Sequence, residues 1–255
     1  MTPLRVRCPA KINTFLSVGP PDAIGYHPVR TVFQAVDLCD ELLLENADDD
    51  AFVCDWPLIP ADNTVTKAWR LAREYVGLPR LRVTLNKRIP AESGLGGGSS
   101  DAAGLLRGLV RLTKGRFLPE NAAEVARAVG SDVPFFLVGG SAKGEGYGDI
   151  LTSLPDGPTR HFVIVRPEVG VSTPSAYRAL DARARAWREF PTDPTSEMFN
   201  DFEPVAPPEC RQAASDLKDV GAMNTLLCGS GSAVFGLFAD EDQADTCLLY
   251  TSRCV

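Results

Sequence analysis

Apolar and polar residues follow regular spacings along much of this chain, and the spacings predict both strands and helices. Within Leu81–Asn86 the two kinds alternate, which is the two-residue period of a strand with one face in water. Between residues 65 and 76 apolar side chains recur at three- and four-residue steps, the spacing of an amphipathic helix. Asn63 or Thr64 can cap the start of this helix, and Gly77 ends it.

The same two periods, together with turn residues, place the other elements. The turn-rich segment Leu154–Pro158 is the best candidate for a linker, so we expect two domains, residues 1–156 and 157–255. Strands mixed with helices in this way predict an α+β fold. The acidic run Asp48–Asp50 is interpreted as a solvated loop. Strands are expected over residues 6–18, 31–37, 135–138 and 161–165 and as a pair within 224–238, and helices over residues 102–112, 119–129, 175–188 and 210–220.

The composition is that of an acidic globular protein. Its 26 Lys and Arg residues stand against 33 Asp and Glu residues, and the resulting net charge of −7 disfavours binding to nucleic acid. No stretch reaches the roughly 20 apolar residues that cross a bilayer, and the first residues lack the apolar segment of a signal peptide. We therefore expect a cytoplasmic protein, a monomer or weak homodimer, with no nucleic-acid or membrane partner.

Cysteine and histidine usage narrows the chemistry further. The seven cysteines are scattered and include no C-x-x-C pair, so we interpret them as reduced and mostly structural. His27 and His161 are the only histidines in the sequence, which excludes the H-E-x-x-H and Cys₂His₂ zinc motifs. We therefore expect no transition-metal catalysis, and no residue is assigned as a metal ligand.

A glycine-rich loop, Pro90–Asp101, lies between a predicted strand and a predicted helix. Its four glycines allow several backbone N–H groups to converge, and the start of the following helix adds partial positive charge. The loop therefore predicts an anion site suited to phosphate, with Ser99, Ser100 and Asp101 as helix caps. It is neither a Walker A loop nor G-x-G-x-x-G. A tight strand-to-helix connection without a ligand is the alternative.

Two other polar groups gain interest beside this loop. Lys11 and Asn13 lie on one face of a predicted strand, and Asp132 follows a helix in a Gly-Ser-Asp-Val-Pro turn. Taken singly, the first pair fits an exposed edge strand, and the carboxylate fits a turn that bonds nearby amides. Together with a phosphate loop they supply the parts of phosphoryl transfer: charge stabilisation, a cation beside the nucleophile, and an acceptor for the hydroxyl proton.

With these motifs the sequence resembles the GHMP kinases. The resemblance extends from residue 9 to about residue 238, and two of its segments, Gly-Tyr-His at residues 25–27 and Gly-Ser-Asp-Val-Pro-Phe-Phe at 130–136, point to one member of the family. The matching segments are Pro9–Asn13, Gly25–His27, Arg30–Gln34, Pro90–Ser100, Gly130–Phe136, Asn200–Pro204 and Gly229–Gly236.

The resemblance implies a fold and an activity. The fold would be a two-domain GHMP kinase fold: an N-terminal α+β domain with a left-handed βαβ phosphate loop and a C-terminal ferredoxin-like domain. The activity would be transfer of the γ-phosphoryl group of ATP, with Mg²⁺, to the C2 hydroxyl of a cytidine-diphosphate-linked methylerythritol. Asp132 would be the general base, and Lys11 would keep it ionised and stabilise the alkoxide.

Binding residues are carried over in the same way. Tyr26 and His27 resemble the cytosine end of the substrate site, although a half-buried Tyr–His corner in a loop is the alternative. Asn13 and Tyr177 are further substrate-binding candidates, and the Gly229–Ser232 turn is as well explained by a plain hairpin as by ligand contact. The residues expected to bind ATP are Pro90, Ala91, Glu92, Ser93, Gly94, Leu95, Gly96, Gly97, Gly98, Ser99 and Ser100.

The sequence also departs from the family pattern. Ile24 and Thr14 replace the usual Asp and Leu, but neither has a chemical role. From Thr246 the chain no longer follows the family's last helix, so we expect the final helix and strand to be truncated or altered, which would expose a sheet edge. A catalytically impaired nucleotide-binding protein of this fold and a kinase for another small alcohol therefore stay as alternatives, whereas a sheet-based RNA-binding module is disfavoured by the acidic balance.

Overall fold

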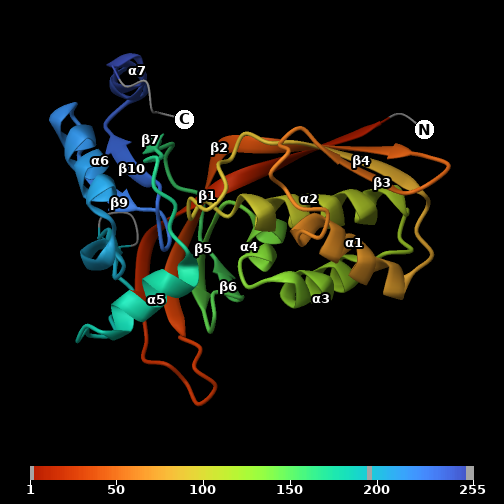
Figure 1. Ribbon diagram of the computed structural model, residues 1–255, viewed down its shortest axis with the longest axis horizontal. Coiled ribbons are helices and arrows are strands. Elements are labelled where there is room, and N and C mark those ends of the chain that lie inside the picture. Colours follow the sequence, from red (N-terminus) through yellow and green to blue (C-terminus); the bar gives the residue numbers. More distant parts are fainter. Residues whose placement is uncertain (1–2, 194–196, 251–255) are drawn as a thin grey trace. The chain divides into compact units, whose positions relative to one another are not determined.

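The computed structural model describes residues 3–193 and 197–250 (Figure 1), and these residues group into two compact units. The first unit holds residues up to 11, 35–91 and 96–139, and the second holds residues 12–34, 92–95 and those from 140 onward. Strands β1 (Leu4–Val18) and β2 (Val29–Asn46) contribute to both. The units thus differ in outline from domains divided at residue 156, because two long strands continue from one unit into the other. The boundary at residue 156 stays a prediction.

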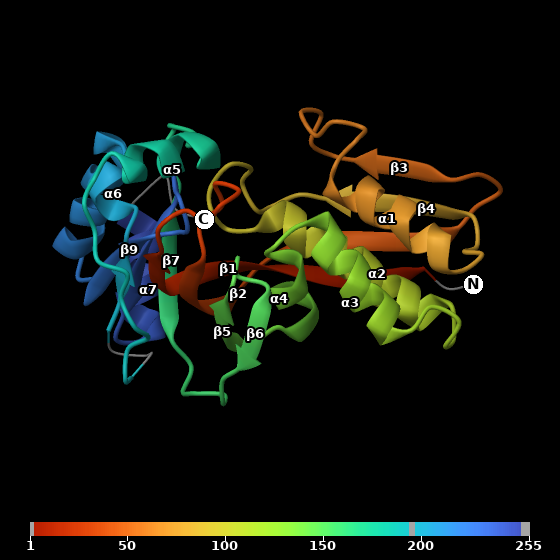
Figure 2. The ribbon, with the colours of Figure 1, turned by 90° about the horizontal axis from the view of Figure 1, so that it is seen from below.

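The first unit is a sheet with helices packed on one face (Figures 1 and 2). Strand β4 pairs antiparallel with the later part of β2 and parallel with β3. Helix α2 packs so closely on the strands that a Cβ at Gly104 would lie 2.3 Å from Cys8 Sγ, and one at Gly108 would lie 2.3 Å from Leu44 Cδ1. The elements are β3 (Ala51–Cys54), α1 (Thr64–Tyr75), β4 (Leu81–Asn86), α2 (Gly97–Leu112), α3 (Pro119–Val129) and α4 (Val133–Val138).

Helix α1 shows why the local pattern succeeds. Asn63 Oδ1 accepts hydrogen bonds from the backbone N–H groups of Val65 and Thr66, and Thr66 Oγ1 accepts one from the Asn63 N–H at 2.9 Å. This reciprocal capping box satisfies donors that the first helical turn would otherwise leave unbonded. The predicted helix, its cap and the strand at residues 81–86 are confirmed.

The strand predicted over residues 135–138 is wrong, because this segment lies in helix α4. Val133, Pro134, Phe135 and Phe136 are all buried. A short, continuous apolar run has no period that separates a buried strand from a buried helix. Pro134, in the first turn, needs no N–H partner there and favours the helix.

The second unit contains a hairpin, a short parallel contact and a three-stranded sheet. Strand β5 pairs antiparallel with β6 and with the start of β2, and β8 pairs with the end of β1. Strand β10 lies between β7 and β9, antiparallel to both. The elements are β5 (Ser141–Glu145), β6 (Ile150–Ser153), β7 (His161–Val165), α5 (Thr173–Asp181), β8 (Phe199–Asn200), η1 (Glu203–Val205), α6 (Pro208–Asp219), β9 (Asn224–Leu227), β10 (Val234–Phe238) and α7 (Glu241–Tyr250).

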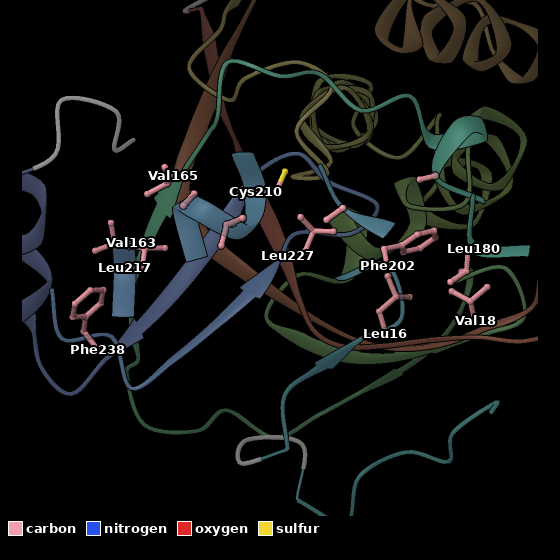
Figure 3. Close-up of a cluster of buried hydrophobic side chains, with 14 of the residues drawn as sticks. Leu16, Val18, Val163, Val165, Leu180, Phe202, Cys210, Leu217, Leu227 and Phe238 are labelled. Atoms are coloured by element: carbon pink, nitrogen blue, oxygen red, sulfur yellow. The ribbon is translucent and has the colours of Figure 1, made fainter. Parts of the chain in front are cut away.

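One apolar cluster gives this unit its core (Figure 3). Val163 and Val165 of β7, Phe238 of β10 and Leu217 of α6 belong to it, as does Cys247 of α7. The last helix therefore forms at least as far as Tyr250 and covers part of the core. The rest of the atypical tail, including Cys254, lies outside the described residues, so its predicted truncation or alteration stays a prediction.

Helix α5 ends at Asp181, so the helix predicted over residues 175–188 is too long. The Arg185 guanidinium donates to the carbonyl oxygens of Leu180 at 3.0 Å and Val18 at 3.1 Å, and the Arg188 N–H donates to Ser17 Oγ at 2.9 Å. These contacts with the end of β1 hold the segment in an irregular path. Helical spacing in the sequence could not reveal such distant partners.

The structure also bears on three smaller expectations, concerning the acidic run, the cysteines and membrane-spanning segments. Asp50 is at the surface but is not simply solvated, because it accepts hydrogen bonds from Arg73, Arg80 and the Leu81 N–H. The six cysteines within the described residues are free thiols. Across the same residues, each helix is too short or too polar to cross a membrane.

Candidate functional site

Three residues of the glycine loop adopt positive φ angles before helix α2 begins. Glu92, Gly94 and Gly96 have positive φ angles of 54°, 77° and 73°. Gly96 is the N-cap of α2 in the left-handed conformation, and no side chain caps the helix there. The expectation that Ser99, Ser100 and Asp101 cap this helix is wrong, since they lie within its first turns.

The first turn of α2 keeps the features of an anion site. Its first N–H groups have no capping side chain, and the turn carries no acidic residue. The first hydrogen bond within the helix joins the Ser100 N–H to the Gly96 carbonyl oxygen at 2.9 Å. The N–H groups of Gly97, Gly98 and Ser99 therefore remain for a ligand or water, at the positive end of the helix dipole.

Close packing explains why this loop needs so many glycines. A Cβ at Gly94 would lie 1.9 Å from the Cys228 carbonyl oxygen, and one at Gly96 would lie 2.8 Å from Phe136 Cζ. A Cβ at Gly97 would lie 2.9 Å from Ile89 Cγ2. Part of the glycine content is thus required by the protein's own packing as well as by the approach of a ligand.

The Gly229–Ser232 turn contacts the middle of the same loop. Besides the approach of Gly94 to Cys228, the Ala233 N–H donates to the Ser93 carbonyl oxygen at 3.1 Å. The turn is therefore more than an isolated hairpin connection, because it supports the loop backbone. Contact between this turn and a ligand remains a prediction.

Lys11 and Asp132 form an ion pair beside the start of α2. The distance from Lys11 Nζ to Asp132 Oδ2 is 3.6 Å. The lysine side chain is 5% exposed and the aspartate side chain 33% exposed, so only the carboxylate is open to solvent or substrate. A Cβ at Gly96 would lie 3.3 Å from Lys11 Cε, which places the lysine against the N-cap of α2. The structure thus brings together the predicted cation, carboxylate and phosphate loop.

Asn13 is buried, and its side chain has a structural partner. Its Nδ2 donates to Thr31 Oγ1 at 2.7 Å, and Thr31 Oγ1 donates to the Phe15 carbonyl oxygen at 2.8 Å. This chain of bonds links β1 to β2. The amide is therefore not presented as a freely exposed edge-strand group.

Tyr26 and His27 are neighbours in sequence but have different surroundings. Tyr26 is 64% exposed, and its ring meets the edge of the Tyr147 ring with centroids 5.8 Å apart. Asp22 supports this arrangement, accepting from the Tyr26 N–H at 2.9 Å and from the Tyr147 hydroxyl at 2.5 Å. The Tyr147 hydrogen bond, with bonds from nearby N–H groups, lowers the pKa of Asp22. Because Tyr26 is largely exposed, its side chain is accessible to a planar ligand.

His27 is buried and both of its ring nitrogens have partners. Nδ1 lies 2.8 Å from the Gly19 carbonyl oxygen, and Nε2 lies 3.3 Å from Asp181 Oδ2. Arg185 Nη2 lies 3.3 Å from Nδ1. The ring packs against Tyr177 with centroids 5.1 Å apart. The structure therefore joins His27 to Tyr177, and a base edge would compete with these partners for the imidazole.

Asp181 and Arg185 are neighbours of this histidine that the sequence pattern did not indicate. Asp181 lies four residues after Tyr177, which places both on one face of α5. That spacing is a usable signal once Tyr177 is a candidate. Arg185 lies beyond the helix and gives no comparable signal.

A buried ion cluster of Asp40, Lys87 and Asp101 was also missed. Lys87 Nζ contacts both carboxylates and lies 2.8 Å from Asp101 Oδ2, and all three side chains are at most 4% exposed. Burial, followed by the charge of Asp40, raises the pKa of Asp101 to about 7, although the Lys87 charge opposes this. Burial favours a lower pKa for Lys87, but the two carboxylates raise it overall. Two buried carboxylates thus share one cation.

A cavity of about 630 Å³ lies elsewhere in the first unit. It is lined by residues of β1, β2 and α2, and no residue predicted to bind ATP or substrate is among them. Arg107, in its wall, donates to the carbonyl oxygens of Phe136 at 2.9 Å and Arg7 at 2.6 Å. The cavity's size therefore does not identify it as the site of phosphoryl transfer.

Comparison with known families gives two matches. Residues 63–140 match the GHMP kinases N terminal domain, and residues 194–250 match the GHMP kinases C terminal domain. A curated relative, 4-diphosphocytidyl-2-C-methyl-D-erythritol kinase of Geobacter sulfurreducens, is 36% identical over 261 residues, covering 96% of this chain and 93% of the relative. The same-named enzyme of Moorella thermoacetica is 36% identical over 256 residues, covering 92% and 90%.

Solved structures agree with these matches. A crystal structure of 4-(cytidine 5'-diphospho)-2C-methyl-D-erythritol kinase has a TM-score of 0.85 and 32% identity, covering 99% of this chain and 97% of that one. Homoserine kinase from Cytophaga hutchinsonii has a TM-score of 0.69 at 19% identity, covering 97% and 88%, and shows a shared fold. The α+β prediction and the family resemblance are both confirmed. This chain belongs to the GHMP kinases and has their two-domain fold.

Proposed function

We propose that this protein transfers the γ-phosphoryl group of ATP to the C2 hydroxyl of 4-diphosphocytidyl-2-C-methyl-D-erythritol, a step in isoprenoid precursor synthesis. The observation that carries the proposal is the Lys11–Asp132 ion pair beside the uncapped start of α2. The substrate assignment is supported by relatives of that name that are 36% identical over nearly the whole chain.

Asp132 is the proposed general base. Its partly exposed carboxylate accepts the proton of the attacking hydroxyl, and the oxygen forms a bond to the γ-phosphorus of ATP. The bond between that phosphorus and the bridging oxygen breaks, and ADP leaves. Lys11, 3.6 Å from the carboxylate, stabilises the negative charge on the attacking oxygen.

Residues 90–100 are the proposed ATP-phosphate site, with the first N–H groups of α2 as donors. Mg²⁺ is the proposed counter-ion, which offsets the negative charge of the phosphates. Within the described residues, no group of three or more His, Cys, Asp or Glu side chains can hold a metal ion. This is compatible with Mg²⁺, which commonly takes one or two carboxylates and completes its shell with phosphate oxygens and water.

The cytidine end is proposed to bind at Tyr26, His27 and Tyr177, with Asn13 as a further substrate-site residue. The exposed Tyr26 ring supports stacking on the base. Because both imidazole nitrogens of His27 already have partners, its role is to shape the pocket, and backbone groups nearby recognise the base edge.

The direct test is ADP release with 4-diphosphocytidyl-2-C-methyl-D-erythritol, galactose, homoserine and mevalonate as separate acceptors. The proposal expects turnover with the first alone. Turnover restricted to another acceptor would establish a kinase for a different alcohol, and ATP binding without turnover of any would establish the impaired alternative.

The base assignment is tested by Asp132→Asn. We expect kcat to fall by about 10²- to 10⁴-fold, because proton transfer is lost, while the Kd for ATP changes by less than about twofold. Asp219→Asn, which alters an exposed carboxylate at the end of α6, is the matched control and should leave kcat unchanged. Near-normal kcat in Asp132→Asn would refute the assignment.

A further inference from the structure

Lys87 and Asp101 lie at the two ends of the glycine loop. Lys87 directly follows the last residue of β4, and Asp101 directly follows Ser100 in the first turns of α2. Their charged atoms are 2.8 Å apart, so one ion pair joins the chain entering the loop to the chain leaving it. Both residues belong to the first unit.

Asp40 binds the residues that directly precede the glycine loop. Its Oδ1 accepts hydrogen bonds from the Arg88 N–H at 2.5 Å and the Ile89 N–H at 2.8 Å, and its Oδ2 contacts Lys87 Nζ. The Asp40 side chain is fully buried. This residue therefore sets both the backbone just before the loop and the position of the Lys87 ammonium.

The cluster lies directly beneath the first turn of α2. A Cβ at Gly97 would be 3.1 Å from Lys87 Nζ. Thr64 Oγ1 donates to the Gly98 carbonyl oxygen at 2.6 Å and restrains the same turn from α1. The turn whose N–H groups would receive phosphate is thus supported by the buried Lys87 from below and by the partly exposed Thr64 from α1.

We propose that Asp40, Lys87 and Asp101 form a loop clasp, a set of positioning residues that holds the glycine loop in its phosphate-binding shape before nucleotide arrives. This inference rests on the proposed function for the role of the loop. Glycine has the largest conformational freedom of any residue, so ordering a glycine-rich backbone when a ligand binds carries an entropic cost. A loop fixed in advance by the clasp does not incur that cost on binding.

One substitution can break the Lys87–Asp101 ion pair without leaving an unpaired charge buried. With Asp101 ionised, one cation faces two carboxylates, and the thiols of Cys8 and Cys54 lie close enough to feel the charges of this cluster. Asp101→Leu leaves Lys87 paired with Asp40, so a balanced pair stays buried. The variant should fold, with a melting temperature equal to or above that of the unchanged protein.

The experiment measures Mg·ATP affinity by calorimetry and amide hydrogen exchange in the nucleotide-free protein. In Asp101→Leu, we expect the Kd for Mg·ATP to rise about tenfold and the amides of residues 91–100 to exchange faster, with stability maintained. Asp101→Asn keeps an oxygen that can accept from Lys87, so its affinity should stay within about twofold of the original.

Asp50→Leu is the matched control, because Asp50 also receives a cation and a backbone N–H beside β4, at the strand's other end. It should leave Mg·ATP affinity and loop exchange unchanged. An unchanged Kd in Asp101→Leu, or loop exchange equal to that of the original protein, would overturn the clasp. If the original protein binds no Mg·ATP, the proposed function fails, and loop exchange alone decides whether the clasp stands.

Discussion

Strand β4 is held at each end by an aspartate, and the two aspartates differ in their access to water. At the start, Asp50 accepts from Arg73, Arg80 and the Leu81 N–H, with a side chain 27% exposed. At the far end, Asp40 accepts from Lys87 and two backbone N–H groups, with no exposure. The bonding is similar, but water screens only the first group of charges.

This difference indicates which end of β4 is better suited to support the proposed phosphate loop. The Asp50 contacts tolerate rearrangement, because water can replace a lost partner. The Asp40 contacts do not, because each buried charge depends on the others. A glycine loop needs such a rigid base if its backbone is to present N–H groups in a fixed array.

Removal of the buried cation is the change with the largest expected effect. Lys87→Met leaves Asp40 and Asp101 buried without a counter-charge and should lower the free energy of unfolding by about 3–5 kcal/mol. Arg73→Met, at the exposed end, should cost about 0–1 kcal/mol. Urea denaturation of both variants measures the contrast. Equal losses would show that burial does not separate the two clusters.

The pH dependence of stability sharpens the same contrast. Burial raises the pKa of Asp101 from 3.8 to about 7, so the folded state binds this proton more tightly than the unfolded state. The stabilising contribution is present below about pH 4 and is lost as the pH rises through about 7. Relative to Asp101→Asn, which cannot ionise, the original protein should therefore lose stability over this range.

Urea denaturation of the two proteins at several pH values between 4 and 8 checks this sign. Asp50→Asn serves as the control for loss of a carboxylate at the exposed end of β4. A stability difference between the original protein and Asp101→Asn that stays constant with pH would contradict the prediction.

A smaller effect is expected where the loop packs on the buried cluster. In Gly97→Ala the new methyl group would lie 2.9 Å from Ile89 Cγ2 and 3.1 Å from Lys87 Nζ, so we expect a loss of about 1–3 kcal/mol. Gly77→Ala is the matched control, since no atom lies within 4 Å of its added Cβ. Thermal unfolding compares the two, and a stability loss in Gly77→Ala as large as that in Gly97→Ala would count against close packing as the cause.

The smallest effect belongs to the exposed end itself. Asp50→Asn should cost about 0–1 kcal/mol at low salt, and the cost should shrink as salt screens the arginines. Urea denaturation at 0.05 and 1 M NaCl measures the salt dependence of this cost, because the Debye length falls from roughly 10–30 Å to roughly 3 Å between these ionic strengths. A cost that does not depend on salt would show that water screens the Asp50 contacts no better than those of the buried Asp40–Lys87–Asp101 cluster.

Sequence reasoning succeeded where the relevant information is local. The capping box at Asn63 and the strand Leu81–Asn86 are encoded within a few residues. The residue types of the glycine loop and its place between a strand and a helix are equally local. Reasoning failed at residues 135–138 and beyond Asp181, where burial and distant hydrogen bonds decide the backbone.

In the candidate site, too, the residue types were recognisable from local sequence but their contacts were not. Motifs singled out Lys11, Asp132 and residues 90–100, but their adjacency became visible only when Lys11 was found 3.6 Å from Asp132 and packed against Gly96. Asp40 and Lys87 carried no local signal of function. Their importance arises from a salt bridge between residues far apart in sequence.

The mixed strand and helix content, the family resemblance and the chemical groups available for phosphoryl transfer could all be read from the amino-acid sequence. Those properties follow from side-chain type and short-range spacing. The folded chain was needed to show which glycines have no room for a side chain, which nitrogens of His27 have partners, and which carboxylates share the Lys87 cation. These depend on distances between separate segments and on the exclusion of water, which no short stretch of sequence specifies.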